Sequence, residues 1–332
     1  MIYHLFQLLK DYDIPGQGLM SYLSFRAMLA SVTAMLISFF AGRRIIRWLQ
    51  KKQIGETIRD LGLEGQMQKK GTPTMGGVII ILAITVPVLL FCDLTNIYTQ
   101  LLLFTTLWCG GIGFADDYIK VFKHNKEGMS ERGKLILQIL LGVIVGLTVC
   151  FNNDIVVREK VNVAEASNGT TYLPQGSSDL DVDSETIVSS SGWKMENIVK
   201  STKTTIPFVK NHEFDYKWLS PFQGAWGWYC KWAIYVLMIV IVITACSNGT
   251  NLTDGMDGLA AGSSAIVGIV IGIIAWLSGN LINSNYLNIM YIPGSGEVAV
   301  FMSIFVGALF GFLWYNSYPA QVFMGDTGSL AI

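Results

Sequence analysis

The chain has 332 residues, of which 52% are hydrophobic and only 14% are charged, and its formal net charge is −1 at pH 7. Soluble domains carry about 25% charged residues, so this composition excludes an ordinary soluble protein. Five cysteines and three histidines are scattered without disulfide, zinc or HExxH spacing, and no basic patch interleaved with aromatic residues indicates a nucleic-acid partner. The composition therefore predicts an integral membrane protein, and no cleavable signal peptide is evident at its start.

Seven apolar segments approach the length of about 20 helical residues that a bilayer requires. They are residues 21–41, 75–91, 97–115, 135–151, 228–246, 259–277 and 298–315, and an eighth begins at Ser329. Residues 1–19 are expected to lie at the membrane interface, and Arg26 in the first segment is expected to extend its charge to that interface. We predict an all-α polytopic membrane protein with at least seven complete transmembrane helices. It would form a single domain over residues 1–332, truncated within the eighth span.

The charges between these segments predict the orientation of the chain. Residues 42–74 contain eight lysines and arginines, and the loop that follows residue 115 is also basic. Loops rich in lysine and arginine stay in the cytoplasm, so the N-terminus is expected on the outer side of the membrane. Residues 152–227 are polar and net acidic, and we expect them to form an extracytoplasmic, partly disordered loop.

Two adjacent carboxylates, Asp116 and Asp117, follow the third apolar segment, and Lys120 comes three residues later. Neighbouring carboxylates repel each other at neutral pH unless a cation or a raised pKa relieves the repulsion. The pair therefore predicts a divalent-metal site at the membrane boundary. The alternative is a polar helix end that only marks this boundary.

Three further loops on the same predicted face carry unusual polar residues. Residues 69–77 read Lys-Lys-Gly-Thr-Pro-Thr-Met-Gly-Gly, in which lysines, glycines and hydroxyl groups can approach an anion. Asn251, Asp254 and Asp257 recur every three residues, so a helix that begins there would align them on one face. Asp326 stands at the predicted start of another helix. For these acidic residues the alternative is capping of a helix N-terminus.

Together the loops would bring acidic and basic side chains to one face of the membrane. The set comprises Asp116, Asp117, Asp254, Asp257, Asp326, Lys69, Lys70 and Lys120. Mg²⁺ binds one or two carboxylates and shares its other positions with phosphate and water, and lysines suit a polyphosphate. These residues predict phosphoryl transfer from a soluble nucleotide to a lipid at the cytoplasmic face.

Five stretches resemble the signature motifs of the bacterial phospho-N-acetylmuramoyl-pentapeptide transferases, within the polyprenyl-phosphate N-acetylhexosamine-1-phosphate transferase superfamily. They are residues 69–77, 113–120, 251–260, 292–297 and 323–329. The resemblance implies a Mg²⁺-dependent, homodimeric enzyme of the bacterial inner membrane that acts in peptidoglycan synthesis, cell shape and cell division. It would transfer phospho-MurNAc-pentapeptide from UDP-MurNAc-pentapeptide to undecaprenyl phosphate, yielding lipid I and UMP.

The resemblance also implies roles for single residues. Asp326 matches the magnesium ligand, Asp116 matches the carboxylate that deprotonates the lipid phosphate, and Asp117 lies beside it in the catalytic set. The positions that match nucleotide contacts are Lys69, Leu252, Gly255, Asp257, Asn316 and Phe323, with Phe323 expected to stack on the uracil. The other substrate-binding positions are Thr74, Lys120, Asn251 and Asp254.

The chain departs from the family pattern in two places. Residues 160–195 are predicted to be an insertion in the outer loop, and the later spans with their histidine-rich cytoplasmic loop are missing. The second departure predicts that part of the active site is missing. A first alternative is a relative that transfers GlcNAc-1-phosphate. In other classes, the alternatives are an ion-coupled transporter, which would place carboxylates near mid-span, and an inactive binding partner.

Overall fold

The computed structural model describes residues 1–9, 17–52, 71–123, 128–162, 193–206, 213–222 and 224–332. The helices are α1 (Ile2–Leu8), α2 (Leu23–Lys51), α3 (Gly77–Phe91), α4 (Ile97–Phe122), α5 (Glu131–Phe151), α7 (Ala225–Thr253), α8 (Leu259–Ser278), α9 (Leu281–Tyr286), α10 (Gly296–Asn316) and α11 (Gly325–Ser329). Two short 3-10 helices are η1 (Gln17–Ser21) and η4 (Tyr216–Leu219), and the strands are β1 (Val157–Asn162), β2 (Trp193–Val199), β3 (Lys203–Thr205) and β4 (Glu213–Asp215).

Six of the described helices are long and apolar enough to cross a membrane: α2, α4, α5, α7, α8 and α10. The seventh predicted span, α3, is apolar but has only 15 residues, fewer than the roughly 20 that a straight crossing requires. A mainly helical, polytopic membrane protein is therefore confirmed.

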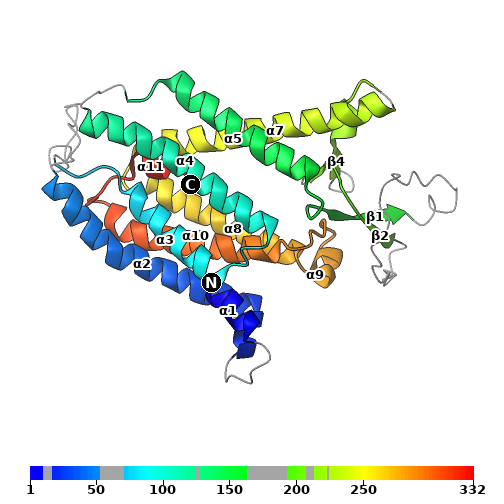
Figure 1. Cartoon of the computed structure of the whole chain (residues 1–332), viewed down its shortest axis with the longest axis horizontal. Coiled ribbons are helices and arrows are strands. Elements are labelled where there is room, and N and C mark those ends of the chain that lie inside the picture. Colours follow the sequence, from blue (N-terminus) through cyan, green and yellow to red (C-terminus); the bar gives the residue numbers. More distant parts are fainter. Residues whose placement is uncertain (10–16, 53–70, 124–127, 163–192, 207–212, 223) are drawn as a thin grey trace.

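The core of the larger helical group surrounds α10, which packs between α2 and α8 and also contacts α3 (Figure 1). Val300, Ile304, Leu309 and Phe312 of α10 are fully buried among these neighbours. A helix that is apolar on all sides takes such a central position. The helices α5 and α7 form a second pair, which contacts the first group through α4, α8 and the short α11.

Three helices continue beyond their predicted ends: α2 ends at Lys51, α4 at Phe122 and α7 at Thr253. The apolar spans predicted to end at residues 41, 115 and 246 therefore cover only part of each helix. Apolar composition marks the part of a helix that suits the bilayer, whereas backbone hydrogen bonding continues through polar residues until the helix terminates. Asp116 and Asp117 therefore lie on α4 and not in a loop.

The predicted helix start at Asp326 is confirmed, because Asp326 lies in the first turn of α11, which begins at Gly325. The apolar span predicted from Ser329 does not coincide with this helix, since Ser329 is the last residue of α11. The apolar run alone could not reveal this start, because Gly325, Asp326 and Thr327 of the first turn are not hydrophobic. The helix start depends instead on contacts from other segments, described below.

Arg26 does not extend to the membrane interface, so that prediction was wrong. Its guanidinium is only 4% exposed and forms an ion pair with Glu297 at the start of α10. The ring of Tyr3 covers the guanidinium at 4.3 Å from Cζ to the ring centroid, and the backbone N–H of Asp93 donates to Glu297 at 2.9 Å. A charge within a membrane helix is costly unless it is paired, and the partner lies 271 positions away in the sequence.

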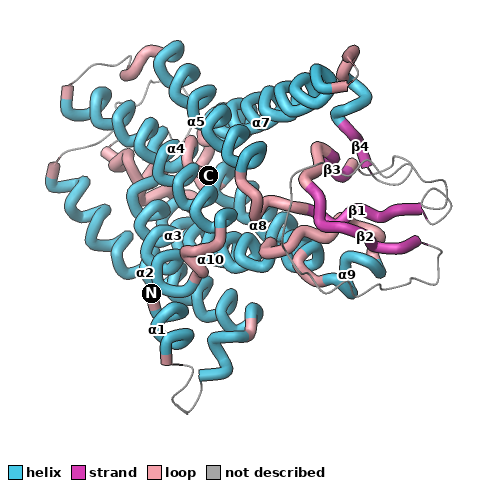
Figure 2. Tube along the Cα trace, turned by 45° about the vertical axis from the view of Figure 1, so that its right-hand side comes forward, coloured by secondary structure: helices cyan, strands magenta, loops and turns pink. Residues whose placement is uncertain are grey.

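The described residues of the polar segment 152–227 include four strands that the sequence did not predict. β1 pairs with β2 and β3 pairs with β4, both antiparallel. The two small sheets lie at the end of the molecule opposite α11 (Figures 1 and 2). The predicted insertion, residues 160–195, falls mostly outside the described residues and stays a prediction.

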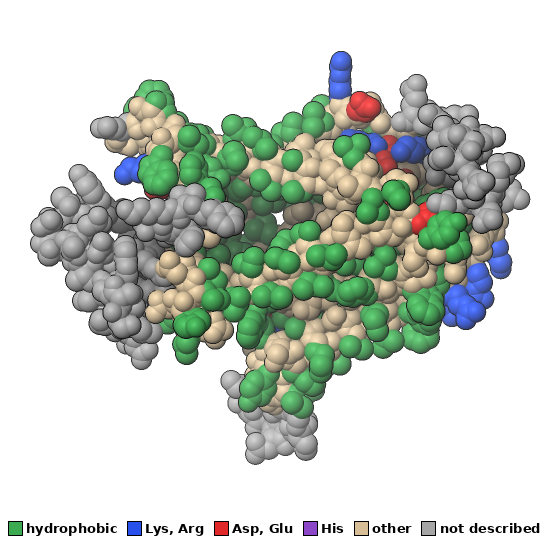
Figure 3. Space-filling model, turned by 180° about the vertical axis from the view of Figure 1, so that it is seen from behind, with side chains coloured by type: hydrophobic (Ala, Val, Ile, Leu, Met, Phe, Trp, Pro, Cys, Tyr) green, Lys and Arg blue, Asp and Glu red, His purple; other side chains and the backbone are tan. Residues whose placement is uncertain are grey.

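Apolar side chains cover the middle of the molecule, and charged side chains gather toward its ends (Figure 3). Exposed large apolar side chains on the long helices include Met28, Phe40, Ile136, Ile266 and Trp314. In water such an extended apolar surface would be unfavourable. In a bilayer it is the surface that faces the lipid chains.

Candidate active site

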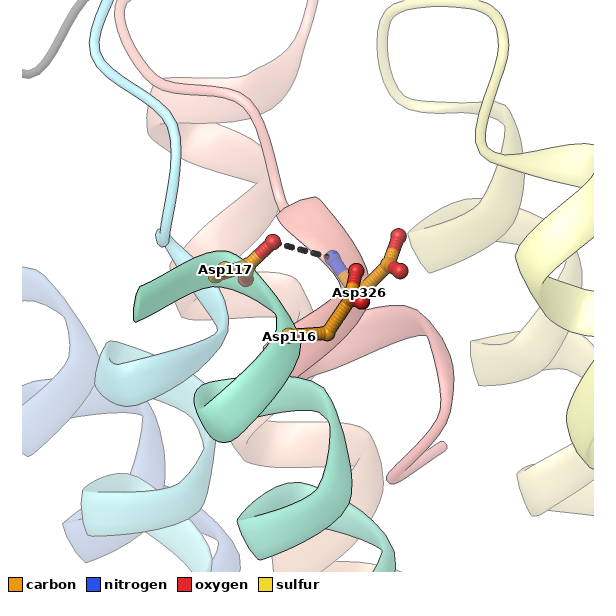
Figure 4. Close-up of side chains that lie close together, drawn as sticks. All are labelled: Asp116, Asp117 and Asp326. Atoms are coloured by element: carbon orange, nitrogen blue, oxygen red, sulfur yellow. Dashed lines mark hydrogen bonds between the residues drawn. The ribbon is translucent and has the colours of Figure 1, made fainter. Parts of the chain in front are cut away.

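Three carboxylates meet where α4 approaches α11. One oxygen from each of Asp116, Asp117 and Asp326 lies within 4.8 Å of the other two (Figure 4). Asp116 is fully buried, Asp117 is 5% exposed, and Asp326 is half-buried. Asp326 is distant in the sequence from the other two, so this grouping depends on how the chain places α11.

The backbone of residues 73–77 holds the segment that leads into α11. Phe323 donates its N–H to the carbonyl of Pro73 at 2.9 Å, and Gly76 donates to the carbonyl of Phe323 at 2.8 Å. Gly77 donates to the carbonyl of Met324, also at 2.8 Å. The described part of the glycine-rich stretch predicted to bind an anion therefore positions the chain just before Asp326.

Two glycines let α11 approach its neighbours closely. A Cβ added to Gly77 would lie 2.0 Å from the backbone nitrogen of Gly328. A Cβ added to Gly113 on α4 would lie 2.0 Å from the carbonyl oxygen of Asp326. Because both contacts are with backbone atoms, no side chain can rotate away, and only glycine allows these distances.

Asp117 accepts hydrogen bonds from the start of α11. Its Oδ1 accepts from the N–H of Asp326 at 3.2 Å, and its Oδ2 accepts from the N–H and Oγ1 of Thr327 at 2.9 and 2.5 Å. The residue at the N-cap of α11, Met324, provides no side-chain acceptor. The expected alternative, a capping Asp326, is therefore wrong, because the acceptor comes from α4.

Asp116 has a different environment, dominated by two lysines. Its Oδ1 accepts from the N–H of Met129 at 2.6 Å, and its Oδ2 lies 2.6 Å from the Nζ of Lys120 and 2.9 Å from that of Lys134. The same two Nζ atoms lie 3.1 and 2.6 Å from Oδ2 of Asp326. Despite the short ion-pair distances, Oδ2 of Asp116 has no hydrogen bond of acceptable geometry among the described residues.

This arrangement fits a hard divalent cation. Oδ2 of Asp116 is buried and lies next to both ammonium groups, so in the absence of an ion the two lysines balance its charge. Three carboxylates against the two ammonium groups of Lys120 and Lys134 leave one negative charge uncompensated. Oxygen donors with excess negative charge are what Mg²⁺ prefers, and the ion readily shares its coordination with a phosphate.

Asn251, Asp254 and Asp257 do not share one helix, so that prediction was wrong. Asn251 belongs to the last turn of α7, Asp254 is its C-cap, and α8 begins only after Gly258, which has a φ of 74°. Asn251 nevertheless reaches α11, because its Oδ1 accepts from Oγ of Ser329 at 2.8 Å. A turn that ends one helix and starts another cannot be recognised from a three-residue repeat.

Asp257 and Asn316 hold the loop that precedes α11. Asp257 Oδ2 accepts from the N–H of Ala320 at 3.2 Å. Asn316 is 2% exposed, donates to the carbonyl of Val322 at 3.0 Å, and accepts from the N–H of Gly258 at 3.0 Å. Among the described residues, neither Asp254 nor Asp257 belongs to the carboxylate cluster.

The remaining predicted positions differ in exposure. Leu252 is 86% exposed and Gly255 is exposed, whereas Thr74 and Phe323 are half-buried. Lys69, with Lys70 beside it, lies outside the described residues. Their predicted contacts with a nucleotide stay predictions.

Two residues at the site escaped the sequence analysis as candidates. Lys134 was counted only as one of the basic residues that set the orientation, and no spacing linked it to Asp116. Thr327 follows Asp326 directly, but its burial and its bond to Asp117 become visible only when α11 is placed against α4. Both roles arise from contacts between distant segments.

Comparison with known proteins agrees with the family resemblance seen in the sequence motifs. The model of glycosyl transferase family 4 matches residues 195–332, and phospho-N-acetylmuramoyl-pentapeptide-transferase signature 1 matches residues 69–81. The chain is 51% identical to the phospho-N-acetylmuramoyl-pentapeptide-transferase of Parabacteroides distasonis, over 100% of this chain and 74% of that protein. It is 52% identical to the protein of the same name from Flavobacterium psychrophilum, over 100% of this chain and 77% of the relative.

Proposed function

This chain belongs to the phospho-N-acetylmuramoyl-pentapeptide-transferase family, and we propose that it catalyses the reaction named for that family. The reaction transfers phospho-MurNAc-pentapeptide from a UDP carrier to undecaprenyl phosphate, and it releases UMP and lipid I. The observation that supports the proposal best is the cluster of three carboxylates and two lysines at one end of the membrane helices. Such a cluster suits a reaction between two phosphates, one soluble and one anchored in the bilayer.

In this proposal Asp326 would hold a magnesium ion, with Asp116 beside it in the same carboxylate cluster. Asp326 is half-buried and more exposed than Asp116, which is fully buried. When bound, the ion supplies positive charge next to the pyrophosphate of the sugar nucleotide. Asp117 is a further carboxylate of the cluster, but its oxygens already accept hydrogen bonds from α11.

Asp116 is also positioned to act on the lipid phosphate. Its carboxylate would accept the proton of the attacking lipid phosphate, whose oxygen would form the new bond to the β-phosphorus that bears the sugar. The pyrophosphate bond between this phosphorus and the oxygen that leaves with UMP would break. Lys120 and Lys134, both within ion-pair distance of Asp116, can neutralise the phosphate oxygens as charge develops on them. The lysines thereby also keep two anionic substrates close together.

The uridine nucleotide is proposed to lie over the loops around α11. Phe323 is half-buried and would stack on the uracil, and the exposed Leu252 and Gly255 would contact the nucleotide. Asp257 and Asn316 would act mainly by holding this loop, because their side chains already bond to its backbone. Lys69, Thr74, Asn251 and Asp254 complete the proposed substrate-binding set.

We further propose that the cluster faces the cytoplasm and that the protein resides in the bacterial inner membrane. The supporting observation is that basic residues concentrate in the segments next to this end of the helices. The strands between α5 and α7 then lie on the outer side, and so does the N-terminus. A homodimer is expected from the family resemblance.

The decisive experiment measures UMP release by the purified protein from the UDP-linked precursor. We expect release only when undecaprenyl phosphate and Mg²⁺ are both present. Asp326→Asn and Asp116→Asn should each lower turnover by at least about 100-fold, since each removes charge at the reacting phosphates. Glu131→Gln is the matched control, because Glu131 is an exposed acidic residue at the same end of the helices.

Two results would contradict the proposal. One is full turnover in Asp326→Asn, which would show that this carboxylate cluster takes no part in the reaction. The other is release of UMP from a UDP-GlcNAc donor in preference to the MurNAc-pentapeptide donor, which would support the related sugar-phosphate transferase. Ion flux without any UMP release would instead indicate a transporter.

A further inference from the structure

We propose that Asp117 and Thr327 are positioning residues that orient Asp326, and that Asp117 is not itself the base. The proposal rests on the proposed function in one respect only, namely that Asp326 holds a divalent cation. Asp117 lies on α4 and Thr327 lies on α11. The N–H and the hydroxyl of Thr327 both donate hydrogen bonds to Oδ2 of Asp117. The contact therefore ties the helix that carries Asp326 to the helix that carries Asp116.

The first turn of α11 needs acceptors that its own sequence does not provide. The first N–H groups of a helix have no partner within the helix and normally bond to the side chain of the N-cap residue. Here the N-cap is Met324, which makes no side-chain bond. Asp117 supplies both acceptors instead, one to the N–H of Asp326 and one to the N–H of Thr327.

The side chain of Thr327 strengthens this arrangement. Thr327 is fully buried, and its hydroxyl donates to Oδ2 of Asp117 at 2.5 Å. Three donors thus converge on one carboxylate that is 5% exposed. Hydrogen bonds to an ionised acceptor are about twice as strong as bonds between neutral groups, so this contact fixes the direction of the α11 first turn.

The direction of that turn decides where the Asp326 carboxylate points. Figure 4 shows the backbone nitrogen of Asp326 bonded to Asp117 while its carboxylate lies near Asp116. Groups that orient a metal ligand without binding the metal typically change affinity by about 10–100-fold when they are removed. Asp117 and Asp116 are neighbours in the sequence, yet Asp117 accepts from the first turn of α11 whereas Asp116 contacts Lys120 and Lys134.

The first test is amide hydrogen exchange of the intact, metal-free protein. In Asp117→Leu the amides of Asp326 and Thr327 lose both acceptors, so the peptide that contains them should gain two rapidly exchanging protons. Asp117→Asn keeps one acceptor oxygen and should gain at least one. In the matched Asp116→Asn variant this peptide should exchange as in the wild type, because Asp116 accepts from Met129 instead.

The second test uses Mn²⁺ as a probe for the divalent cation and measures its binding by electron paramagnetic resonance. Thr327→Val removes only the hydroxyl donor, and we expect Mn²⁺ affinity to fall about tenfold. Thr327→Ser retains the hydroxyl and should restore the affinity. A general loss of structure would lower the melting temperature of both variants, whereas a positioning role predicts that serine rescues binding.

Unchanged exchange in Asp117→Leu would overturn the proposal, and so would equal Mn²⁺ affinity in Thr327→Val and the wild type. Neither measurement needs turnover or either substrate. If UMP release failed while both tests gave the expected results, the proposed reaction would be wrong but the positioning role would stand. If UMP release succeeded while both tests failed, only the positioning role would be lost.

Discussion

At the scale of single residues, adjacent aspartates on one helix have acquired different surroundings. Asp116 faces two lysines and the backbone of Met129, whereas Asp117 faces the first turn of α11. Successive residues on a helix point about 100° apart, so neighbours in sequence need not share partners. Lys134 reaches Asp116 from another helix, α5, and its Nζ lies 2.9 Å from Oδ2 of Asp116, compared with 2.6 Å for Lys120.

Lys134 should be as important for turnover as the carboxylates that it contacts. Its Nζ lies within 3 Å of both Asp116 and Asp326, and its side chain is 16% exposed. Lys134→Met removes a positive charge from the phosphate-binding region, so we expect kcat to fall by about 100-fold. Lys134→Arg should recover part of the loss, and steady-state UMP release measures both.

The control for this substitution is Arg132→Met, which removes an exposed positive charge two residues earlier. We expect it to leave kcat close to the wild-type value. A comparable loss in both variants would mean that the general charge of this end of the protein matters and that the Lys134 contacts do not.

The ion pair between Arg26 and Glu297 is the second charged contact whose energetics can be tested. Both side chains are buried, so removal of one leaves the other charge unpaired. Arg26→Leu should lower the free energy of unfolding by about 3–5 kcal/mol, whereas Arg26→Leu combined with Glu297→Leu should cost much less. Unfolding in mixed micelles measures this difference, and equal losses in the single and double variants would rule out the pair as its source.

At the scale of elements, a five-residue helix is held by three other parts of the chain. The backbone of residues 73–77 pairs with the segment before α11, α4 provides Asp117, and α7 contributes Asn251. Such a short helix is not stable by itself. Its geometry is therefore a property of the packing, and the site depends on close contacts at glycines.

Gly113 provides a test of that packing. An added methyl group would lie 2.0 Å from the carbonyl oxygen of Asp326, so Gly113→Ala must displace α11 from α4. We expect a loss of about 1–3 kcal/mol in the free energy of unfolding, together with weaker Mn²⁺ binding. Unfolding in mixed micelles and paramagnetic resonance provide the two measurements.

The matched control is Gly111→Ala, two residues earlier on the same helix. A Cβ there meets no described atom within 4 Å, and alanine favours a helix over glycine by about 1 kcal/mol. This variant should be as stable as the wild type or slightly more so. If both substitutions destabilised the protein equally, the cause would lie in the α4 helix itself.

At the scale of the whole molecule, the carboxylate cluster and the two small sheets occupy opposite ends of a bundle with an apolar middle (Figures 1 and 3). This separation predicts that the two ends contact different compartments. Leu252, at the end of α7 near the cluster, is 86% exposed, and Tyr286 of α9 is 88% exposed. These residues offer one labelling position at each end.

We expect a membrane-impermeant maleimide to label Tyr286→Cys on intact spheroplasts, in a background without the five native cysteines. Leu252→Cys should react only after the membrane is permeabilised, because basic loops keep its end in the cytoplasm. Labelling of both positions from the same side would contradict the proposed orientation.

The sequence alone determined the class of this protein and the residues around which its site forms. Apolar runs predicted the helical membrane architecture because the bilayer requires about 20 apolar residues per crossing, whatever the packing. The Asp116–Asp117 pair was identified because adjacent carboxylates repel each other unless a cation or a raised pKa relieves the repulsion, and Asp326 by its place at a predicted helix start and its match to a family motif. Family motifs then supplied the expected reaction.

Only the tertiary structure decided which of these residues meet. Asp257 lies outside the carboxylate cluster and bonds to the loop before α11, whereas Lys134 and Thr327 contact the cluster. Arg26, predicted to lie at the membrane interface, is buried and paired with Glu297. These outcomes depend on contacts between segments that no local pattern relates. Which neighbouring element a side chain meets, and how closely glycine backbones approach each other, are set when helices pack, and neither is encoded in the spacing of residues along one segment.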